Sequence, residues 1–228
     1  MADLRCQRGP HVFVDDLEVP TLADDDRHHL ARSLRLRDGD PLTISDGARR
    51  WRTARFGEPI EVEGPILVVA APPWPATIAC ALAKGAKPEL VVQKATEIGI
   101  DHIVFFTGDH SVPTWDAAKR AKAGVRLARV AREAAMQSRQ VRLPTIELAD
   151  DLASVAAAVP ELVRADFGGK AIDRSVRAVA VGPEGGWSDA ERQSLPEAVD
   201  LGPTVLRAET AALVAATRLT AWRGASPG

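Results

Sequence analysis

Short apolar runs bounded by Gly, Pro and Asp divide this chain of 228 residues into two parts with different hydrophobic patterns. In the first 70 residues such runs predict strands at 11–14, 41–45, 51–56, 60–62 and 66–70, and one helix at 25–34. This pattern is typical of a small, mostly β, barrel-like domain. Proline at the density of Pro72-Pro73-Trp74-Pro75 cannot sit inside a helix or a central strand. We therefore predict two domains, 1–71 and 76–228.

From Ala76 onward, apolar runs alternate with longer segments of helical periodicity. The predicted strands are 77–83, 102–106, 161–165, 178–181 and 198–201, and the predicted helices are 88–98, 116–140, one starting at 188, and 209–222. Strands that alternate with helices indicate an α/β domain with a parallel sheet covered on both faces.

The long helix predicted at 116–140 has two distinct faces. Its basic stripe consists of residues spaced by three or four: Lys119, Lys122, Arg126, Arg129 and Arg132. The adjoining face, predicted to pack, consists of Ala121, Val125, Ala128, Ala131 and Ala135. The helix ends in Met136-Gln-Ser-Arg-Gln140, which is rich in hydrogen-bond donors and is predicted to contact a substrate. A frayed polar terminus is the structural alternative.

The net charge of −2 conceals an uneven distribution. Residues 27–55 contain eight arginines and three aspartates, and residues 119–142 contain eight basic residues and one glutamate. Either stretch taken alone is explained equally well by a solvent-exposed charged surface and by a binding site. Two windows in an otherwise acidic chain favour a polyanionic partner, because clustered Lys and Arg neutralise phosphates.

Other features limit the class of protein. No apolar run approaches the roughly 20 residues of a membrane helix, and no signal-peptide core is present, so we expect a cytoplasmic protein that does not enter membranes. Cys6 and Cys80 form no CxxC pair, and His28-His29 has no third ligand at a suitable spacing. Neither a disulfide nor a metal site is expected.

Two Gly/Pro turns follow predicted strands near the C-terminus, Gly182-Pro-Glu-Gly-Gly-Trp187 and Leu201-Gly-Pro203. Neither matches GxGxxG or GxxxxGK[ST], which disfavours dinucleotide enzymes and NTPases. Ser188-Asp-Ala-Glu191 is a capping box that would fix the first turn. Open α/β sheets bind ligands beyond the carboxyl ends of their strands, so two such turns predict a pocket.

The second turn leads into Arg207-Ala-Glu-Thr210 at the start of the last predicted helix. Glu209 and Thr210 have a structural explanation there as helix-capping residues. Arg207 has none, because a cation near a helix N-terminus is unfavourable unless an anion compensates. That anion is either Glu209 or a substrate.

Five motifs in order resemble one family. They are His28-His-Leu-Ala-Arg-Ser-Leu-Arg-Leu-Arg-Asp-Gly-Asp40, Gln93-Lys-Ala-Thr-Glu-Ile-Gly99, Ala134-Ala-Met-Gln-Ser-Arg139, Val181-Gly-Pro-Glu-Gly-Gly186 and Leu201-Gly-Pro-Thr-Val-Leu-Arg-Ala-Glu-Thr210. Together they resemble the ribosomal small-subunit RNA methyltransferase E family. The resemblance implies a SPOUT-type parallel sheet with a C-terminal trefoil knot, preceded by a PUA-like RNA-binding barrel. It also implies S-adenosylmethionine as methyl donor, N3 of a uridine in 16S ribosomal RNA as acceptor, and a homodimer.

Carried onto this sequence, the resemblance assigns a role to each group of residues. The donor site comprises Asp166, Gly182, Pro183, Gly185, Gly186, Leu201, Gly202, Pro203 and Leu206. The catalytic residues are Arg207, Glu209 and Thr210, and the RNA contacts are Arg32, Arg35, Arg37, Arg129, Arg132, Gln137, Ser138 and Arg139. The chain departs from the family at Asp166-Phe167-Gly168, where a Glu or a His-Pro stretch is common, and at Met136 and Gln140.

Two other functions fit parts of the sequence. A non-catalytic RNA-binding module would use the barrel and the basic stripe, but it would not need the Gly turns or Arg207. A small-molecule α/β enzyme would leave the arginines incidental and predicts no salt-dependent affinity for RNA.

Overall fold

The computed structural model describes residues 4–85, 87–113 and 115–224, and these form two compact units. The first unit comprises residues 1–71 and 132–143, and the second comprises 72–131 and 144–228. The division after residue 71 falls at the proline-rich segment. Residues 132–143 come from the middle of the sequence, yet they group with the N-terminal unit.

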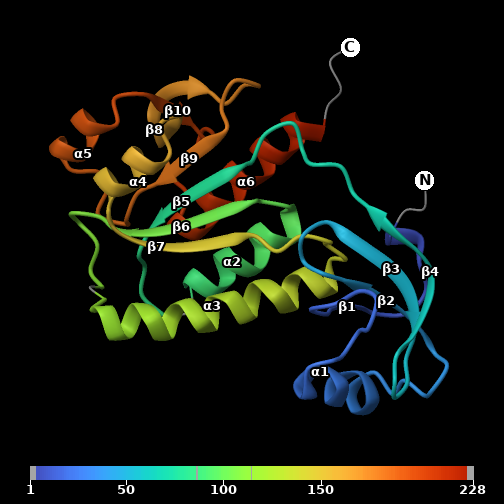
Figure 1. The fold of residues 1–228 in the computed structure, drawn as a ribbon. Coiled ribbons are helices and arrows are strands. Elements are labelled where there is room, and N and C mark those ends of the chain that lie inside the picture. Colours follow the sequence, from blue (N-terminus) through green and yellow to red (C-terminus); the bar gives the residue numbers. More distant parts are fainter. Residues whose placement is uncertain (1–3, 86, 114, 225–228) are drawn as a thin grey trace. The chain divides into compact units, whose positions relative to one another are not determined.

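The first unit is built on a four-stranded sheet (Figure 1). Its elements are a 3-10 turn η1 (Leu4–Cys6), β1 (His11–Phe13), α1 (Asp24–His28), a π-helical turn η2 (His29–Ser33), β2 (Pro41–Ser45), β3 (Arg50–Arg55) and β4 (Glu61–Val68). Strand β1 pairs with β2 in parallel, whereas β2, β3 and β4 are antiparallel neighbours. The two strands predicted at 60–62 and 66–70 are one continuous strand, β4, in which Gly64 has φ +64°.

Buried aliphatic side chains of β1, β2 and β3 form the core of the first unit together with Leu30, Phe56 and Ile60. The segment 132–143 belongs to this unit through several contacts. The carbonyl of Val141 accepts from Ser45 Oγ at 3.1 Å and from the amide of Arg49 at 2.9 Å. His11 is buried between the Thr43 hydroxyl and the Gln140 carbonyl.

The second unit is a six-stranded, fully parallel sheet with helices on both faces (Figure 1). Its elements are β5 (Thr77–Ala81), α2 (Lys87–Ile98), β6 (His102–Thr107), α3 (Ala117–Gln137), β7 (Thr145–Asp151), α4 (Leu152–Ala158), β8 (Leu162–Ala171), β9 (Ala178–Val181), α5 (Asp189–Ser194), β10 (Ala198–Asp200) and α6 (Ala208–Gly224). The strand order is β10-β8-β9-β5-β6-β7. The parallel sheet predicted from the sequence is confirmed.

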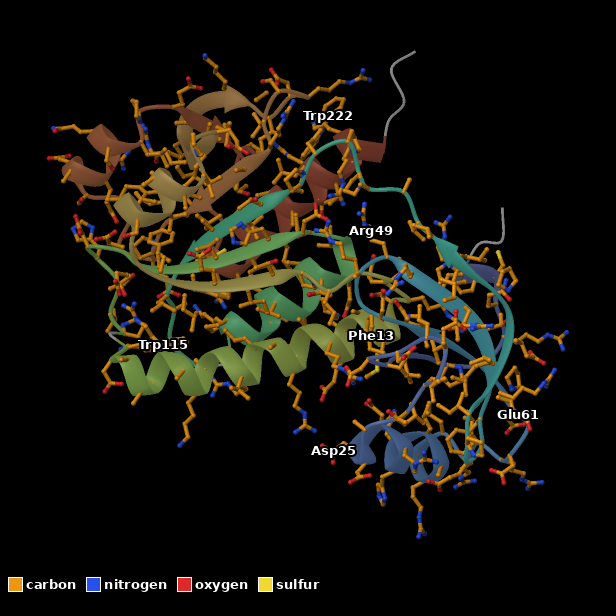
Figure 2. All side chains as sticks on the ribbon, in the orientation of Figure 1. Phe13, Asp25, Arg49, Glu61, Trp115 and Trp222 are labelled. Carbon is orange, nitrogen blue, oxygen red and sulfur yellow. The ribbon has the colours of Figure 1, made fainter. Side chains whose placement is uncertain are left out.

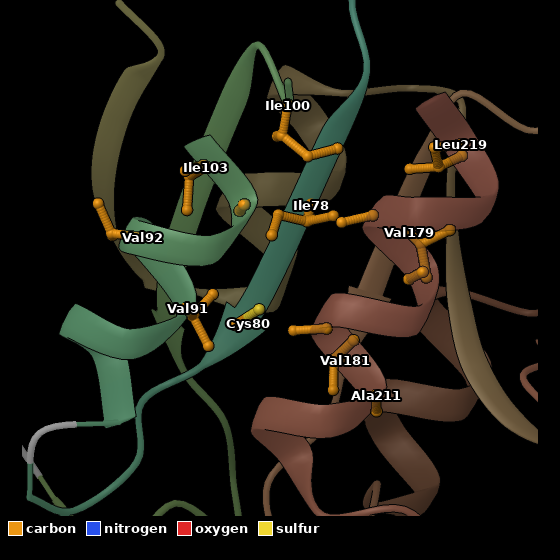
Figure 3. Packing of buried hydrophobic residues seen from close by; sticks show 14 of the residues in the cluster. Ile78, Cys80, Val91, Val92, Ile100, Ile103, Val179, Val181, Ala211 and Leu219 are labelled. Atoms are coloured by element: carbon orange, nitrogen blue, oxygen red, sulfur yellow. The ribbon is translucent and has the colours of Figure 1, made fainter. Parts of the chain in front are cut away.

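The side chains of the central strands alternate between two cores. On one face Ile78, Cys80 and Val179 pack against α2 and α6, as Figure 3 shows. On the other face Ala79 and Phe106 belong to a second cluster with residues of α4 and with Trp187 and Leu195, which flank α5. Since both faces are covered, the central strands are continuous apolar runs, which is why the sequence predicted them well.

Two elements of the second unit, β7 and α4, were not predicted. Strand β7 lies at the edge of the sheet, and its sequence Thr-Ile-Glu-Leu-Ala-Asp-Asp is partly exposed along its length. An edge strand has little apolar surface to bury, so it leaves only a weak hydrophobic pattern. Helix α4 spans just seven residues, and Asp151 caps it by accepting from the amide of Ser154 at 2.8 Å.

The packing face predicted for the long helix was largely wrong. Ala121, Val125 and Ala128 are exposed, whereas Ala131 and Ala135 are buried as expected. The buried line runs instead through Ala123, Leu127, Ala131 and Ala134. Alanine faces are weak predictors because each methyl group buries little area, and Leu127, the larger aliphatic residue, sets the orientation.

Candidate active site

A pocket of about 690 Å³ opens in the second unit where β9 and β10 end, beside the middle of β8. These strands are neighbours in the sheet, with β8 between the other two. Both Gly/Pro turns line this pocket, together with residues of β8 and with Lys87. The volume lies within the roughly 300–1,000 Å³ of small-molecule sites. The two turns predicted to form one pocket are therefore brought together.

The first turn follows β9 and packs against Trp187. A Cβ atom at Gly182 would lie 2.8 Å from the Trp187 ring, and Gly186 has φ +77°, so both positions favour glycine. The Trp187 indole Nε1 donates to the Ala165 carbonyl at 2.9 Å, which ties this turn to β8. The predicted capping box is present: Glu191 N donates to Ser188 Oγ at 3.1 Å, and Ser188 N donates to Glu191 Oε2 at 2.8 Å.

The middle wall of the pocket is a bulge in β8. Ala198 of β10 pairs with Arg164, but the next residue, Val199, pairs with Lys170, so residues 165–169 project from the ladder. The strand predicted at 161–165 would end before Asp166, but Asp166 lies inside β8, in this bulge. Its carboxylate forms ion pairs with Arg192 and with Arg164, the latter at 3.3 Å.

The second turn follows β10 and is organised by Asp200. Asp200 Oδ1 accepts from the Gly202 amide at 2.8 Å, and Oδ2 accepts from the Gly168 amide of the bulge at 3.3 Å. Gly202 has φ +138°, a conformation that L side chains rarely adopt. The guanidinium of Arg218 in α6 donates to the carbonyls of Asp200 and Leu201 at 3.0 and 3.1 Å. Three short segments are thus held around one cavity.

Arg207 lies on the pocket wall, directly before α6, and is exposed. Among the residues that the structure describes, no carboxylate lies within ion-pair distance of its guanidinium. The sequence left two possible anions for this arginine, Glu209 or a substrate. Glu209 forms an ion pair with Lys87 instead. The guanidinium is therefore available to a ligand in the pocket.

Glu209 lies in the first turn of α6, and its side chain is 15% exposed. Its Oε2 lies 3.4 Å from Lys87 Nζ but accepts no hydrogen bond within the described part of the chain. Lys87 instead donates to Glu184 of the first turn. This hydrogen bond raises the pKa of Lys87 and lowers the pKa of Glu184. Thr210, the third predicted catalytic residue, is exposed, and neither Glu209 nor Thr210 is part of the pocket lining.

Most of the residues assigned to the donor contribute to the pocket surface. Those that line it are Asp166, Gly182, Pro183, Gly186, Leu201, Gly202 and Leu206. The other two, Gly185 and Pro203, belong to the same turns but not to the lining. A Cβ atom at Gly185 would lie 2.9 Å from the Cβ of His110, so this glycine allows two loops to approach closely.

The residues assigned to RNA occupy different environments. Arg32, Arg35 and Arg37 are exposed in and after η2, and Arg129 and Gln137 are exposed on α3. Arg132 forms a two-pronged ion pair with Asp26, at 2.8 and 2.6 Å, and also donates to the Phe13 carbonyl at 3.0 Å. Arg139 donates to the carbonyls of Leu4 and Gly9, and Ser138 Oγ donates to the Ala134 carbonyl. These last three side chains are engaged within the first unit.

Several pocket residues had no role predicted from the sequence, among them Asp200, Trp187 and Lys87. Asp200 directly precedes the Leu201-Gly202 turn, and an acidic residue at that point was a usable signal. Trp187 was quoted within its motif but given no role. Lys87 comes from the start of α2, almost a hundred residues before Glu184, and only the fold brings it to the pocket.

Comparison with known families gives the class of the chain. Residues 70–220 match the family model described as "RNA methyltransferase domain", and residues 22–61 match "RNA methyltransferase PUA domain". The first match spans the parallel sheet and the pocket. The class defined by fold and site is that of the RNA methyltransferases with a PUA domain.

A curated relative narrows this class. The "Ribosomal RNA small subunit methyltransferase E" of Mycobacterium bovis is 33% identical, over 89% of this chain and 88% of its own length. The chain belongs to the ribosomal RNA small subunit methyltransferase E family.

Solved structures share the fold. A Legionella pneumophila protein in complex with the bound cofactor SAM has a TM-score of 0.82 at 24% identity, covering 94% of this chain and 98% of that one. The ribosomal RNA small subunit methyltransferase E of Neisseria gonorrhoeae, bound to S-adenosyl methionine, has a TM-score of 0.77 at 23% identity, covering 92% and 96%. The SPOUT-type fold and the PUA-like first unit expected from the sequence are confirmed. None of the described helices is both long and apolar enough to cross a membrane.

Proposed function

We propose that this protein transfers the methyl group of S-adenosylmethionine to N3 of one uridine in 16S ribosomal RNA. The observation that carries the proposal is the position of Arg207, an exposed guanidinium with no carboxylate partner in the described structure, on the wall of the pocket formed by both Gly turns. The remaining parts of the proposal come from the family resemblance. They are a homodimer, a trefoil knot in the C-terminal part, and action on the small ribosomal subunit in the cytoplasm.

The pocket suits the methyl donor in its size and its exposed main chain. Its glycines expose main-chain groups, because a side chain at Gly182 would collide with Trp187. Its charged lining residues are Lys87, Asp166, Glu184, Asp200 and Arg207, of which Asp166 and Glu184 are already paired with cationic side chains. S-adenosylmethionine would supply an already activated methyl group on its sulfonium. We assign its adenosine to the main chain of both turns, with Asp166 and Leu206 beside it.

Methylation at N3 requires that the uracil lose its imide proton, since the lone pair of the neutral nitrogen is delocalised into the ring carbonyls. We assign to Arg207 the stabilisation of the resulting anion, because a guanidinium presents several donors in a fixed plane. Such a contact forms fully only as negative charge develops, and it therefore lowers the barrier rather than tightening substrate binding.

We assign the proton-accepting role to Glu209, acting directly or through a water that it orders. Its Oε2 is buried and accepts no hydrogen bond from a described residue. Lys87 Nζ lies 3.4 Å from this oxygen. Because Glu209 lies outside the present pocket lining, we place it in this role only with substrate bound. Thr210, one residue further along α6, would act only with substrate bound, since its side chain lies outside the present lining.

The test is methyl transfer to small ribosomal subunits from cells that lack the protein. Arg207→Ala is expected to lower the single-turnover rate by about 100-fold or more, the cost of removing one donor that stabilises a developing anion. The dissociation constant of S-adenosylmethionine, measured by calorimetry, should change by less than about threefold. Arg207→Lys is the matched control, and it should recover part of the rate because it keeps the charge but loses the planar fork.

Two results would contradict the proposal. Equal losses of rate and donor affinity in Arg207→Ala would make Arg207 a donor-binding residue. Failure of the wild-type protein to bind S-adenosylmethionine would favour the alternative of a non-catalytic RNA-binding module.

A further inference from the structure

Phe167 differs from every other phenylalanine of the chain. The protein has five, and Phe13, Phe56, Phe105 and Phe106 are all at most 7% exposed. Phe167 is 60% exposed and lies in the β8 bulge that forms the middle wall of the pocket. An aromatic ring that stays in solvent adds little to the stability of the fold, and beside a ligand pocket it is a candidate contact for a planar ligand.

The backbone that carries Phe167 is held firmly. The Ala165 carbonyl accepts from the Trp187 indole, and the Gly168 amide donates to Asp200, so the bulge is tied on both sides of the phenylalanine. Gly169 allows β10 to approach, because a Cβ atom there would lie 2.6 Å from backbone atoms of Ala198 and Val199. The bulge therefore presents the ring from an ordered support.

The surroundings of Phe167 match the chemistry of a pyrimidine. The same pocket is lined by Val205, which is 83% exposed, and by Arg207. Its mouth thus offers an aromatic face, an aliphatic side chain and a guanidinium. A uracil ring presents two π faces and two carbonyl oxygens that flank N3. Proteins read single-stranded RNA by stacking bases on aromatic side chains, and enzymes that modify a base take it out of its stack.

We propose that Phe167 is the stacking platform for the target uracil and holds its N3 edge toward Arg207. This inference rests on the proposed function and adds the residue that positions the acceptor. The exposure of Phe167 favours the acceptor over the donor, because a small-molecule ligand is mostly buried in its pocket whereas an RNA base must enter from solvent.

The experiment measures two quantities for Phe167 variants. One is kcat/KM for methylation of small subunits that lack the modification, and the other is the dissociation constant of S-adenosylmethionine. Phe167→Ala is expected to lower kcat/KM by about 10-fold or more, the usual loss for one base-stacking aromatic. The donor dissociation constant should stay within about twofold. Phe167→Tyr should restore activity and Phe167→Leu should not, because a stacking platform needs a ring.

Trp222→Ala is the matched control. Trp222, labelled in Figure 2, is an aromatic residue of α6 that is 38% exposed and outside the pocket lining. Its removal should leave both quantities unchanged. A tenfold weaker donor affinity in Phe167→Ala would assign the ring to the adenine and overturn the proposal. So would normal activity of Phe167→Ala or full activity of Phe167→Leu. A wild-type protein that binds the donor but methylates no uridine would instead overturn the proposed function.

Discussion

At the scale of single residues, the glycines of this chain differ in whether a side chain could replace their hydrogen. Gly182 has no room for a side chain, since a Cβ atom would lie 2.8 Å from the Trp187 ring. Gly124 in α3 is different, because a Cβ atom there would meet only Leu148, at 3.9 Å. The same substitution is therefore expected to have opposite effects at these two positions.

Gly182→Ala should lower the free energy of unfolding by about 1–3 kcal/mol, the usual cost of forcing a methyl group into a packed site. Gly124→Ala, the matched control, should raise it by about 0.5–1 kcal/mol, because alanine restricts the unfolded chain and favours the helix. Urea denaturation of both variants measures these changes. Equal stability of Gly182→Ala and wild type would show that the turn does not pack tightly on Trp187.

The sequence identified site residues only where they are close to a motif. Arg207 was found because a cation before a helix conflicts with the helix dipole. Lys87 has no such local signal, and its contact with Glu184 exists only because α2 and the first turn meet in the fold. Residue types within motifs were therefore predictable, whereas partners from distant segments were not.

At the scale of elements, the strands of the second unit that are buried on both faces were predicted from the sequence, whereas an exposed one and the irregular part of another were not. The central strands β5, β6 and β9 are almost wholly buried, and their apolar runs were recognised. The bulge in β8 was not predictable, because Phe167-Gly168-Gly169 resembles an ordinary loop and only pairing with β10 makes it part of a strand. Edge strand β7 was missed because it is partly exposed along its length and its hydrophobic pattern is weak.

The contact of β1 with residues 132–143 predicts a pH dependence of stability. His11 is 3% exposed, and its Nε2 lies 3.2 Å from the Gln140 carbonyl. Burial lowers the pKa of His11 from 6.5 to about 4. The unfolded chain therefore binds a proton between these pH values and the folded chain does not, so stability is lost as the pH falls from about 6.5 to about 4.

The expected loss from His11 is about 3 kcal/mol over that interval, from 1.36 kcal/mol per pKa unit. Comparison of wild type with His11→Gln by chemical denaturation at several pH values isolates this contribution. The variant should show the smaller pH dependence between 6.5 and 4. The aspartates whose pKa is lowered, such as Asp46, contribute mainly below that interval and are common to both proteins. Identical pH profiles would exclude His11 as the cause.

At the scale of the whole molecule, the sequence overstated the free positive charge. Several arginines of the two basic windows pair with acidic residues outside them: Arg27 with Glu58, Arg52 with Glu18, Arg55 with Glu63, Arg126 with Glu89, and Arg132 with Asp26. Figure 2 shows the charged side chains distributed over both units. Charge counts along a sequence do not include such pairing. The exposed arginines without an ion pair therefore indicate better which residues contact RNA.

Arg32 and Arg37 are exposed, and no ion pair with a described residue engages either side chain. If they contact phosphates, the double variant Arg32→Ala/Arg37→Ala should weaken RNA binding. It should also reduce the slope of log affinity against log salt by about 1.4–1.8, since each lost phosphate contact removes roughly 0.7–0.9. Lys170→Ala, an exposed lysine of β8 outside the assigned RNA contacts, is the control and should leave the slope unchanged. An unchanged slope in the double variant would remove these arginines from the interface.

The most direct test of the account is mass spectrometry of 16S ribosomal RNA from cells with and without this protein. We predict that one N3-methyluridine is present in the first RNA and absent from the second, and that Arg207→Ala fails to restore it. Identical methylation in both RNAs, or a missing methyl group on another atom or base, would contradict the account.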